Sequence, residues 1–550
     1  MKPFEEKINP LTRICFIALA FALLLRLTVG VDFSDEAYYA FFIDDWLKGN
    51  ISSSPFLTIH QTAAFLVYPF SLAYFKLNHS SSGLFLFLRC LFLLFNIIAA
   101  CTWMFFLRRL DFRAAAWLGG IIVLAFIPFG LPAPSYNTLS SQFLIIALAA
   151  LGTLMTYKQF SRAQLICMII SAIAWVIVII AYPTLLGAWL FLCGLILLHR
   201  STFSRPWLYL GILIGACCIG GIVLVASLSF DRLYQSVSYL SAINDTGGFI
   251  RKSEFALMLL KQNTIFTCLC IASILIGIFR NYVALYWASI TMSIIFLILL
   301  FIPPTFLTHS HDAFTLATLM GLGLLSGFKQ NATREARIMA TIYSISLTAS
   351  ILICLTATNS VFNFCIGSVP AASLAVLGPS STANKPLNMI SAIIFIIVIL
   401  STTLFLYYGE SPSKTPQKRH FVSHGFFAGL FLQDNDIELL QLVEKHVSPL
   451  FENDNSVAIF ARNPGIVLVT PARLEMLTPY PLTPSIAEKG IELTHAFYTH
   501  PGNRPKLILI FRDSYFEPIN PMRQDFSTWY ILSDTFKTSD GGELEVYSRK

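Results

Sequence analysis

The feature that most constrains this chain is a long succession of apolar runs between residues 11 and 408. A helix that crosses a bilayer needs roughly 20 mostly apolar residues. Because a backbone inside lipid must satisfy its own hydrogen bonds, such runs predict spanning helices rather than open strands. The runs lie at about 11–31, 83–107, 114–131, 139–157, 163–182, 184–198, 206–228, 256–278, 281–302, 313–328, 338–357 and 388–408.

Two further segments do not read as simple spanning helices. The stretch 62–78 is apolar but short, and we expect an interfacial or re-entrant helix within a large first external loop, 32–82. The segment 361–378 contains Gly367 and Pro370, which permit either a spanning helix or a re-entrant loop. If it spans, the chain has about 13 spanning helices and an external C-terminal part; if not, it has about 12 and a cytoplasmic one.

Clusters of basic residues set the expected orientation, because Lys and Arg accumulate in cytoplasmic loops. We therefore expect the first helix to begin in the cytoplasm, and the second to end there. The loops 32–82, 132–137, 229–255 and 303–312 then lie outside. The basic residues that decide this are Lys2, Lys7 and Arg13 before the first run, and Arg108, Arg109 and Arg113 after the second.

The charged residues divide the chain into two parts. Only 12% of the residues are charged, against roughly 25% in soluble proteins, which excludes a soluble enzyme. It also excludes a disordered chain, a fibrous repeat and a nucleic-acid binder, although the net charge is +7. Residues 1–410 hold 37 charged side chains and the much shorter 411–550 hold 30, so we expect a membrane domain, 1–410, followed by a soluble domain, 411–550.

The pattern of the C-terminal part predicts a small α/β domain, which we place outside the membrane. Its composition and periodicity carry no nucleotide-binding or hydrolase motif, so we expect a docking or substrate-guiding role. The expected strands are 428–432, 456–461, 465–470, 506–511 and 543–548, and the expected helices are 435–450 and 484–498.

Acidic residues gather where the first helix leaves the membrane. Five of the 14 acids in residues 1–410 lie within 32–45, and Asp35 and Glu36 open the segment "DEAYYAFFIDDW". An ionisable group at the membrane is costly and is a functional hypothesis by default. The alternative is a solvated first turn of a helix, where Asp and Glu are also favoured.

A helix ending in "LLLRL", followed after a short gap by "DEAYYA", resembles the GT-C superfamily of polyprenyl-phosphate-sugar-dependent glycosyltransferases. The protein O-mannosyltransferase and lipid A aminoarabinose transferase branches (glycosyltransferase families 39 and 83) are the most similar. The resemblance continues through 59–92, where Arg89 matches an arginine at the start of the second spanning helix. It implies that Asp35 is the catalytic carboxylate, that Glu36 orients it or contacts the acceptor, and that transfer inverts the sugar carbon.

The sequence departs from this family at two places. A second acid late in the first loop is replaced by about His60-Gln61, and an Asp of the second external loop is replaced within "PSYNTLS" by Tyr136 and Asn137. His60 is either a substitute base or ligand, or an ordinary interface histidine. No cofactor is firmly implied, and a divalent cation stays open.

Several other residues are candidates for binding the substrate. Arg251 and Lys252 lie in the long loop that the resemblance brings near the lipid donor, and Lys48 follows the acidic segment. Each is a candidate phosphate contact, with a solvated surface as the alternative. His309, His311 and Asp312 stand at an external helix start, where they suit a cation, a phosphate or a polar cleft lining.

These features together predict an integral-membrane glycosyltransferase of the plasma (inner) membrane, with its active site on the external or periplasmic face. Its expected partners are a polyprenyl-phosphate sugar donor and a lipid, glycan or protein acceptor. A transporter or flippase of a lipid-linked or small polar substrate is the alternative, although such proteins favour charges midway along helices and repeated halves. A polymerase or ligase of lipid-linked glycans is a third reading.

Overall fold

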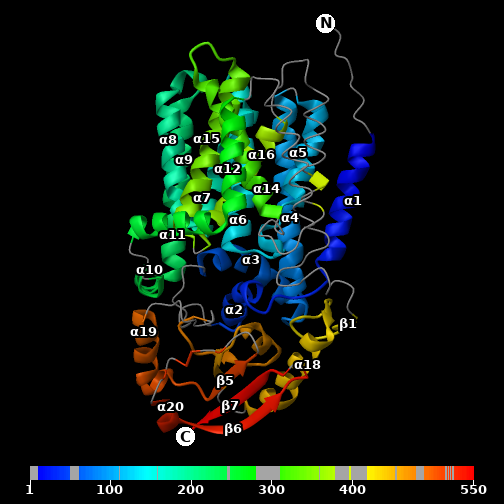
Figure 1. Cartoon of the computed structure of the whole chain (residues 1–550), viewed down its shortest axis with the longest axis vertical. Helices are drawn as coiled ribbons and strands as arrows, with labels where there is room; N and C mark the ends of the chain where they lie inside the picture. The colour runs from blue at the N-terminus through cyan, green and yellow to red at the C-terminus, as the bar shows by residue number, and fades with distance from the viewer. Residues whose placement is uncertain are drawn as a thin grey trace.

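The structure is a computed structural model of the full chain (Figure 1). It describes residues 10–49, 61–110, 112–157, 159–244, 248–279, 310–357, 359–377, 396–397, 400 and 418–550, the last range without 452–454, 479–487, 514–516, 518, 521, 523–524 and 540. The expected spanning runs 281–302 and, almost entirely, 388–408 lie outside these residues.

A helical bundle forms the larger part of the molecule. Six helices of the described part are long and apolar enough to cross a membrane, and a seventh candidate is a bent pair. The helices run side by side along the long axis (Figure 1). They are α1 (Pro10–Arg26), α4 (Leu84–Arg109), α5 (Arg113–Ala125), α6 (Tyr136–Thr156), α7 (Arg162–Ala181), α8 (Leu186–Leu198), α9 (Pro206–Leu228), α12 (Thr264–Ile278), α14 (Ser310–Met320), α15 (Arg334–Thr356) and α16 (Cys365–Leu377).

Most helices of the bundle match the expected runs, and two regions differ. The run 256–278 is not one straight helix, because α11 (Gly248–Gln262) and α12 meet at an angle of 102°. The expected loop 229–255 is largely helical, with α10 (Phe230–Asn244) preceding α11. The segment 361–378 forms η6 (Ser360–Phe364) and α16, which together qualify as a candidate span.

Two helices lie between the bundle and the C-terminal domain, α2 (Asp35–Leu47) and α3 (Gln61–Asn78) (Figure 1). Neither is among the candidate spans of the described part. Nearly all of α2 is buried, with ten of its 13 residues inaccessible, including Phe42 and Trp46. Aromatic side chains therefore pack around the very helix that carries the acidic residues.

The C-terminal domain contains a five-stranded sheet with the order β4-β3-β5-β7-β6. β3 runs parallel to β4 and β5, whereas β7 is antiparallel to both β5 and β6. The strands are β3 (Ser456–Phe460), β4 (Arg473–Leu474), β5 (Leu507–Arg512), β6 (Tyr530–Lys537) and β7 (Glu543–Arg549), with a separate hairpin of β1 (Arg419–Phe421) and β2 (Phe431–Gln433). Helices α18 (Asp434–Leu442), α19 (Glu488–Thr499) and α20 (Phe526–Trp529) complete it.

The expected α/β character of this domain is confirmed, with one wrong strand. The segment 465–470 belongs to a 3-10 helix, η11 (Pro464–Val469), because its apolar side chains are buried against α2 and the domain core rather than paired in the sheet. Strands β1, β4 and β6 were not expected. The exposed β6, with most of its residues accessible, lacks the apolar run by which the inner strands are recognised.

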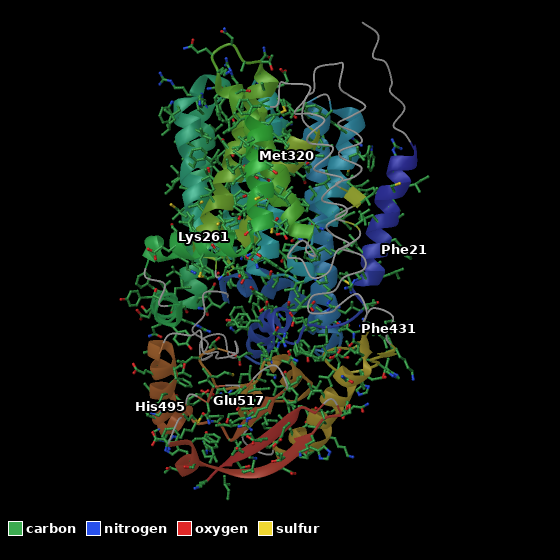
Figure 2. The ribbon with its side chains drawn as sticks, in the orientation of Figure 1. Phe21, Lys261, Met320, Phe431, His495 and Glu517 are labelled. Carbon is green, nitrogen blue, oxygen red and sulfur yellow. The ribbon has the colours of Figure 1, made fainter. Side chains whose placement is uncertain are left out.

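The hydrophobic core of the C-terminal domain is continuous with α2, α3 and the start of α4, whereas most of the bundle has a core of its own. Phe431 in β2 donates its backbone N–H to Thr28 and accepts one from Gly30, so the domain pairs with the exit of α1. Phe427 packs against Phe33 with ring centroids 5.4 Å apart. Figure 2 labels Phe431 at this junction and Phe21 on the outer side of α1. The fold class is thus a helical membrane-type bundle with a small α/β domain fastened to one end.

Candidate functional site

The start of α2 is a tight acidic turn. Ser34 donates both its backbone N–H and its hydroxyl to Oδ1 of Asp32, at 2.9 and 2.7 Å. This turn fixes the chain just before Asp35, the first residue of the helix. A carboxylate at this position is stabilised by the unpaired N–H groups and the positive end of the helix dipole. The turn therefore places Asp35 at the N-terminal end of α2, a position that favours a carboxylate.

Glu36 is held by a buried arginine. Arg89 on α4 donates from Nε and Nη2 to the two carboxylate oxygens, at 2.5 and 2.7 Å, and from Nη1 to the Leu27 carbonyl. Both ionic side chains are almost wholly inaccessible. Bidentate charge-assisted bonds are strong and directional, so this pair fixes α2 to α4 and to the end of α1.

Tyrosine side chains surround Asp35. Its charge acts on the phenols of Tyr39 and Tyr136, as well as on Asp32. The Tyr39 hydroxyl accepts the backbone N–H of Tyr136, at 3.2 Å. Burial raises the pKa of Tyr39 well above its ordinary value, so this phenol stays protonated. The sequence-predicted Asp35, Tyr136 and, beside it, Asn137 are therefore brought together.

A line of contacts leads from these tyrosines to Lys252. The Tyr136 ring lies 5.2 Å from that of Tyr182. The Tyr182 hydroxyl approaches that of Thr356 at 3.5 Å. The adjacent Ala357 carbonyl accepts from Lys252 Nζ at 3.4 Å. The cation therefore lies at the same end of the bundle as Asp35, although about 220 residues separate them in the sequence.

Helix α10 lies against α3 and near α2. Gln61 donates to the Ser236 hydroxyl at 2.7 Å, and both side chains are buried. Arg232 is also buried, and Asp45 is the charge that acts on it. Burial lowers the pKa of Arg232 while Asp45 opposes that shift. An amphipathic helix from the expected external loop thus contacts α3 and lies near the C-terminal half of α2.

The C-terminal domain covers the other side of α2. Gly465 in η11 donates its N–H to the Phe33 carbonyl at 2.7 Å. A Cβ atom at Gly465 would lie 2.6 Å from the Ala37 Cβ and 2.7 Å from the Phe33 oxygen. Only glycine permits this approach, so the domain lies close to residues on both sides of Asp35, the Phe33 backbone and the Ala37 side chain.

Lys48 lies away from this arrangement. It ends α2, and a helix of 13 residues is about 20 Å long. Its Nζ donates to Asp44 at 2.6 Å and to the Ala472 carbonyl at 3.0 Å. Lys48 therefore fastens the far end of α2 to the C-terminal domain and does not meet Asp35.

Of the remaining predicted residues, only Asp312 has a side chain that the structure describes. His60 and His309 lie outside the described residues. Arg251 and His311 are placed on α11 and α14 only by their backbones. Asp312 is buried at 1% exposure in α14, a helix that packs between α12 and α16, and its charge acts on Cys270 and Cys365. It lines the bundle interior rather than the surface of an external loop.

The structure adds one acid that sequence reasoning passed over. Asp32 is only 8% exposed, and its Oδ2 has no hydrogen-bond partner among the described residues. Burial, reinforced by the neighbouring Asp35, raises the pKa of Asp32 to about 7. The sequence signal that could have identified Asp32 is its place in the acidic segment 32–45. Among the described side chains no three His, Cys, Asp or Glu groups are arranged to hold a metal ion.

The bundle, α2 and α3 beneath it and the attached α/β domain together form a fold that recurs among solved structures. Among solved structures, the chain is similar to ArnT from Cupriavidus metallidurans bound to undecaprenyl phosphate, with a TM-score of 0.52 and 10% identity. That match covers 98% of this chain and 97% of ArnT. The fold class expected from the sequence is thereby confirmed, including the C-terminal domain.

A second similarity is lower. The Archaeoglobus fulgidus oligosaccharyltransferase, in complex with Zn and sulfate, has a TM-score of 0.49 at 10% identity, covering 90% of this chain and 67% of that one. No family model and no curated protein matches the sequence. The likeness to ArnT is therefore one of fold, and the chemistry has to be argued from the residues.

Proposed function

We propose that this protein is an integral-membrane glycosyltransferase that moves a sugar from a polyprenyl-phosphate carrier to a hydroxyl group of a lipid, glycan or protein. The observation that carries the proposal is Asp35, presented at the start of a buried helix that packs against η11 of the C-terminal domain. The ArnT structure of the same fold holds undecaprenyl phosphate, which supports a lipid phosphate as the donor's leaving group.

In this proposal Asp35 is the general base. One carboxylate oxygen accepts the proton of the acceptor hydroxyl as that oxygen attacks the anomeric carbon of the sugar. The bond from the anomeric carbon to the phosphate oxygen breaks, and its electron pair leaves with the polyprenyl phosphate. Because this leaving group is a stable anion, it needs no proton from the protein. Direct displacement inverts the anomeric carbon.

The neighbouring acids have other tasks. Both oxygens of Glu36 accept bonds from Arg89, so Glu36 is a positioning residue that orients the start of α2. Asp32, whose pKa is raised to about 7, keeps its proton in about half of the molecules at neutral pH. A neutral Asp32 adds no second negative charge beside Asp35, which favours a single ionised base close to an anionic donor.

Lys252 is the cation we assign to the donor phosphate. It stands at the same end as Asp35, and its one hydrogen bond with a described partner, to the Ala357 carbonyl, is long at 3.4 Å. An ammonium group has three donors, so a phosphate oxygen can replace or join this weak contact. Tyr182 and Thr356 lie along the path between base and cation and suit the sugar hydroxyls. Asn137, whose Oδ1 is buried without a hydrogen-bond partner among the described residues, suits the acceptor.

The basic residues orient the proposed enzyme in the membrane. Arg109, Arg162, Arg205 and Arg334 lie at the end of the bundle opposite the C-terminal domain. By the positive-inside rule that end faces the cytoplasm. Asp35 and the C-terminal domain then face the external or periplasmic side of the inner membrane.

The test is Asp35→Asn in membranes supplied with labelled polyprenyl-phosphate sugar. Loss of a general base lowers the rate by about 10²- to 10⁴-fold. Asp231→Asn, an exposed acid in the first turn of α10, is the matched control and retains full transfer. Unchanged transfer by Asp35→Asn would refute the role of this residue. Vesicle uptake or flipping without sugar transfer would instead favour a transporter.

A further inference from the structure

A second polar cavity lies at the far end of the bundle, away from Asp35 and from the C-terminal domain. It has a volume of about 370 Å³. It opens where α6 ends and where α9 and α15 begin, and the proposed reaction does not use it. Its lining residues are Tyr157, Thr202, Phe203, Ser204, Ala332, Arg334 and Arg337.

The two arginines of this cavity lack an acidic partner. Arg334 donates to the Tyr157 carbonyl at 2.6 Å, and Arg337 donates to the Gln330 carbonyl at 2.7 Å. Neither forms an ion pair with any residue of the described part of the chain. A guanidinium has five N–H donors, so most of their hydrogen-bonding capacity faces the cavity or solvent. Two half-buried positive charges beside a cavity favour an anion within it.

The position of these arginines on their helix strengthens this argument. Arg334 and Arg337 stand at the first and fourth residues of α15, a helix of 23 residues. The positive end of a helix dipole disfavours cations there and attracts anions. Arginine at this end is stabilised once an anion neutralises both the guanidinium groups and the helix terminus.

Neutral donors complete the lining. The Tyr157 hydroxyl accepts from Arg109 Nη2 at 3.3 Å, which leaves its own hydrogen available. The Ser204 hydroxyl accepts from the buried Gln164 at 2.5 Å and is likewise free to donate. Two arginines with adjacent hydroxyls match the oxygens of a phosphate, which arginine binds in forked geometry.

The surroundings of the cavity indicate a lipid. Large apolar side chains near it are exposed, with Leu198 at 79%, Trp207 at 66% and Phe160 at 45%. Arg205 lies over the Phe160 ring at 5.8 Å, so cations and exposed apolar groups meet at one level. This mixture is typical of the boundary between lipid tails and headgroups. A ligand that combines a phosphate with acyl chains can contact both the arginines and the exposed apolar side chains.

We propose that this cavity binds the phosphate of an anionic membrane phospholipid, through Arg334, Arg337 and the neighbouring hydroxyls. The headgroup occupies the cavity and the acyl chains lie along the exposed apolar side chains of α8 and α9. By the distribution of basic residues, this lipid belongs to the cytoplasmic leaflet. The site is separate from the proposed donor site and stands or falls independently of it.

The experiment titrates the purified full chain in detergent with phosphatidylglycerol, with phosphatidylcholine and with inorganic phosphate, and follows binding by native mass spectrometry. We expect saturable binding of phosphatidylglycerol at this site and weaker binding of the other two. The double variant Arg334→Gln and Arg337→Gln should bind phosphatidylglycerol at least roughly tenfold more weakly than the wild type. Arg108→Gln, at the same end but stacked over Trp117, is the matched control and retains wild-type affinity.

Two single variants provide further measurements of phosphatidylglycerol binding. Arg337→Gln alone removes only one carbonyl contact, so it replaces the double variant in the experiment if the double variant does not fold. Arg334→Lys keeps the positive charge and should retain part of the wild-type affinity for phosphatidylglycerol. Equal phosphatidylglycerol affinity in the wild type and the Arg337→Gln and double variants would overturn the proposal. Inorganic phosphate that binds as tightly as phosphatidylglycerol would assign the cavity to soluble phosphate and overturn the lipid.

Discussion

At the scale of single residues, the pair of Glu36 and Arg89 holds the candidate site together. The Arg89 guanidinium joins α4, the start of α2 and the end of α1 through three hydrogen bonds. The resemblance singled out Arg89 by its place in a motif, but its partner was not evident. Only the folded chain brings Glu36 within reach of Arg89, which is 53 positions away in the sequence.

We expect Glu36→Gln to lower the free energy of unfolding by about 3–5 kcal/mol, because it leaves the Arg89 guanidinium buried without a countercharge. Thermal unfolding of the purified protein in detergent measures this loss. Arg473→Gln provides the control, since Arg473 forms an ion pair with Glu475 but is 44% exposed. Exposed pairs contribute about 1 kcal/mol or less. A loss no larger for Glu36→Gln than for the control would contradict the role assigned to the pair.

Asp32 should make stability depend on pH. Burial raises the pKa of Asp32 to about 7 in the folded protein, above the ordinary 3.8 of an aspartate. The folded state therefore keeps a proton that the unfolded state has released, and stability falls as the pH rises through this interval. Below it both states are protonated, and above it both are ionised, so the effect levels off.

We expect the unfolding midpoint of the wild type to drop between pH 5 and pH 8. Asn at position 32 cannot ionise. The contribution of Asp32 to the pH dependence, a few kcal/mol in the free energy of unfolding, should therefore disappear in Asp32→Asn. Asp231→Asn, an exposed acid, should keep the wild-type slope. Identical pH profiles for the wild type and Asp32→Asn would show that the buried carboxyl does not titrate in this range.

At the scale of elements, the contact between η11 and α2 positions the helix that carries Asp35. The sequence predicted a strand at 465–470 because a short apolar run does not distinguish a strand from a buried helical turn. The segment instead lies against α2, where Gly465 reaches the Phe33 carbonyl. The same limitation explains the loop 229–255, in which α10 and α11 become ordered by packing on helices distant in the sequence.

Gly465→Ala tests this contact. The added Cβ meets backbone and a short side chain, neither of which moves easily. Overpacking of this kind costs about 1–3 kcal/mol, and we expect a matching loss of stability with a larger fractional loss of sugar transfer. Gly502→Ala, which meets only the His500 side chain, is the control. Full activity in Gly465→Ala would mean that η11 does not position Asp35.

At the scale of the whole molecule, the C-terminal domain is part of the candidate site and not an appendage. Its hydrophobic core is continuous with α2 and the start of α4. The chain enters the structure at the opposite end of the bundle (Figure 1). If that end is cytoplasmic, the domain must be external.

Protease protection checks this orientation. We expect trypsin to remove a C-terminal epitope tag from right-side-out vesicles and to leave it intact in inverted vesicles. A tag at the N-terminus should give the reverse pattern, which serves as the internal control. Digestion of both tags from the same type of vesicle would contradict the topology and with it the external active site.

The sequence by itself determined the helical membrane part, the soluble α/β tail and the acidic segment at 32–45. Each depends on local composition and periodicity, which short-range physics fixes. The tertiary structure decided which charges meet. It joined Glu36 to Arg89, brought Lys252 to the end occupied by Asp35, turned Lys48 towards Ala472 and set Arg334 and Arg337 around a cavity. Such pairings depend on how helices pack across long sequence separations, and periodicity carries no information about them.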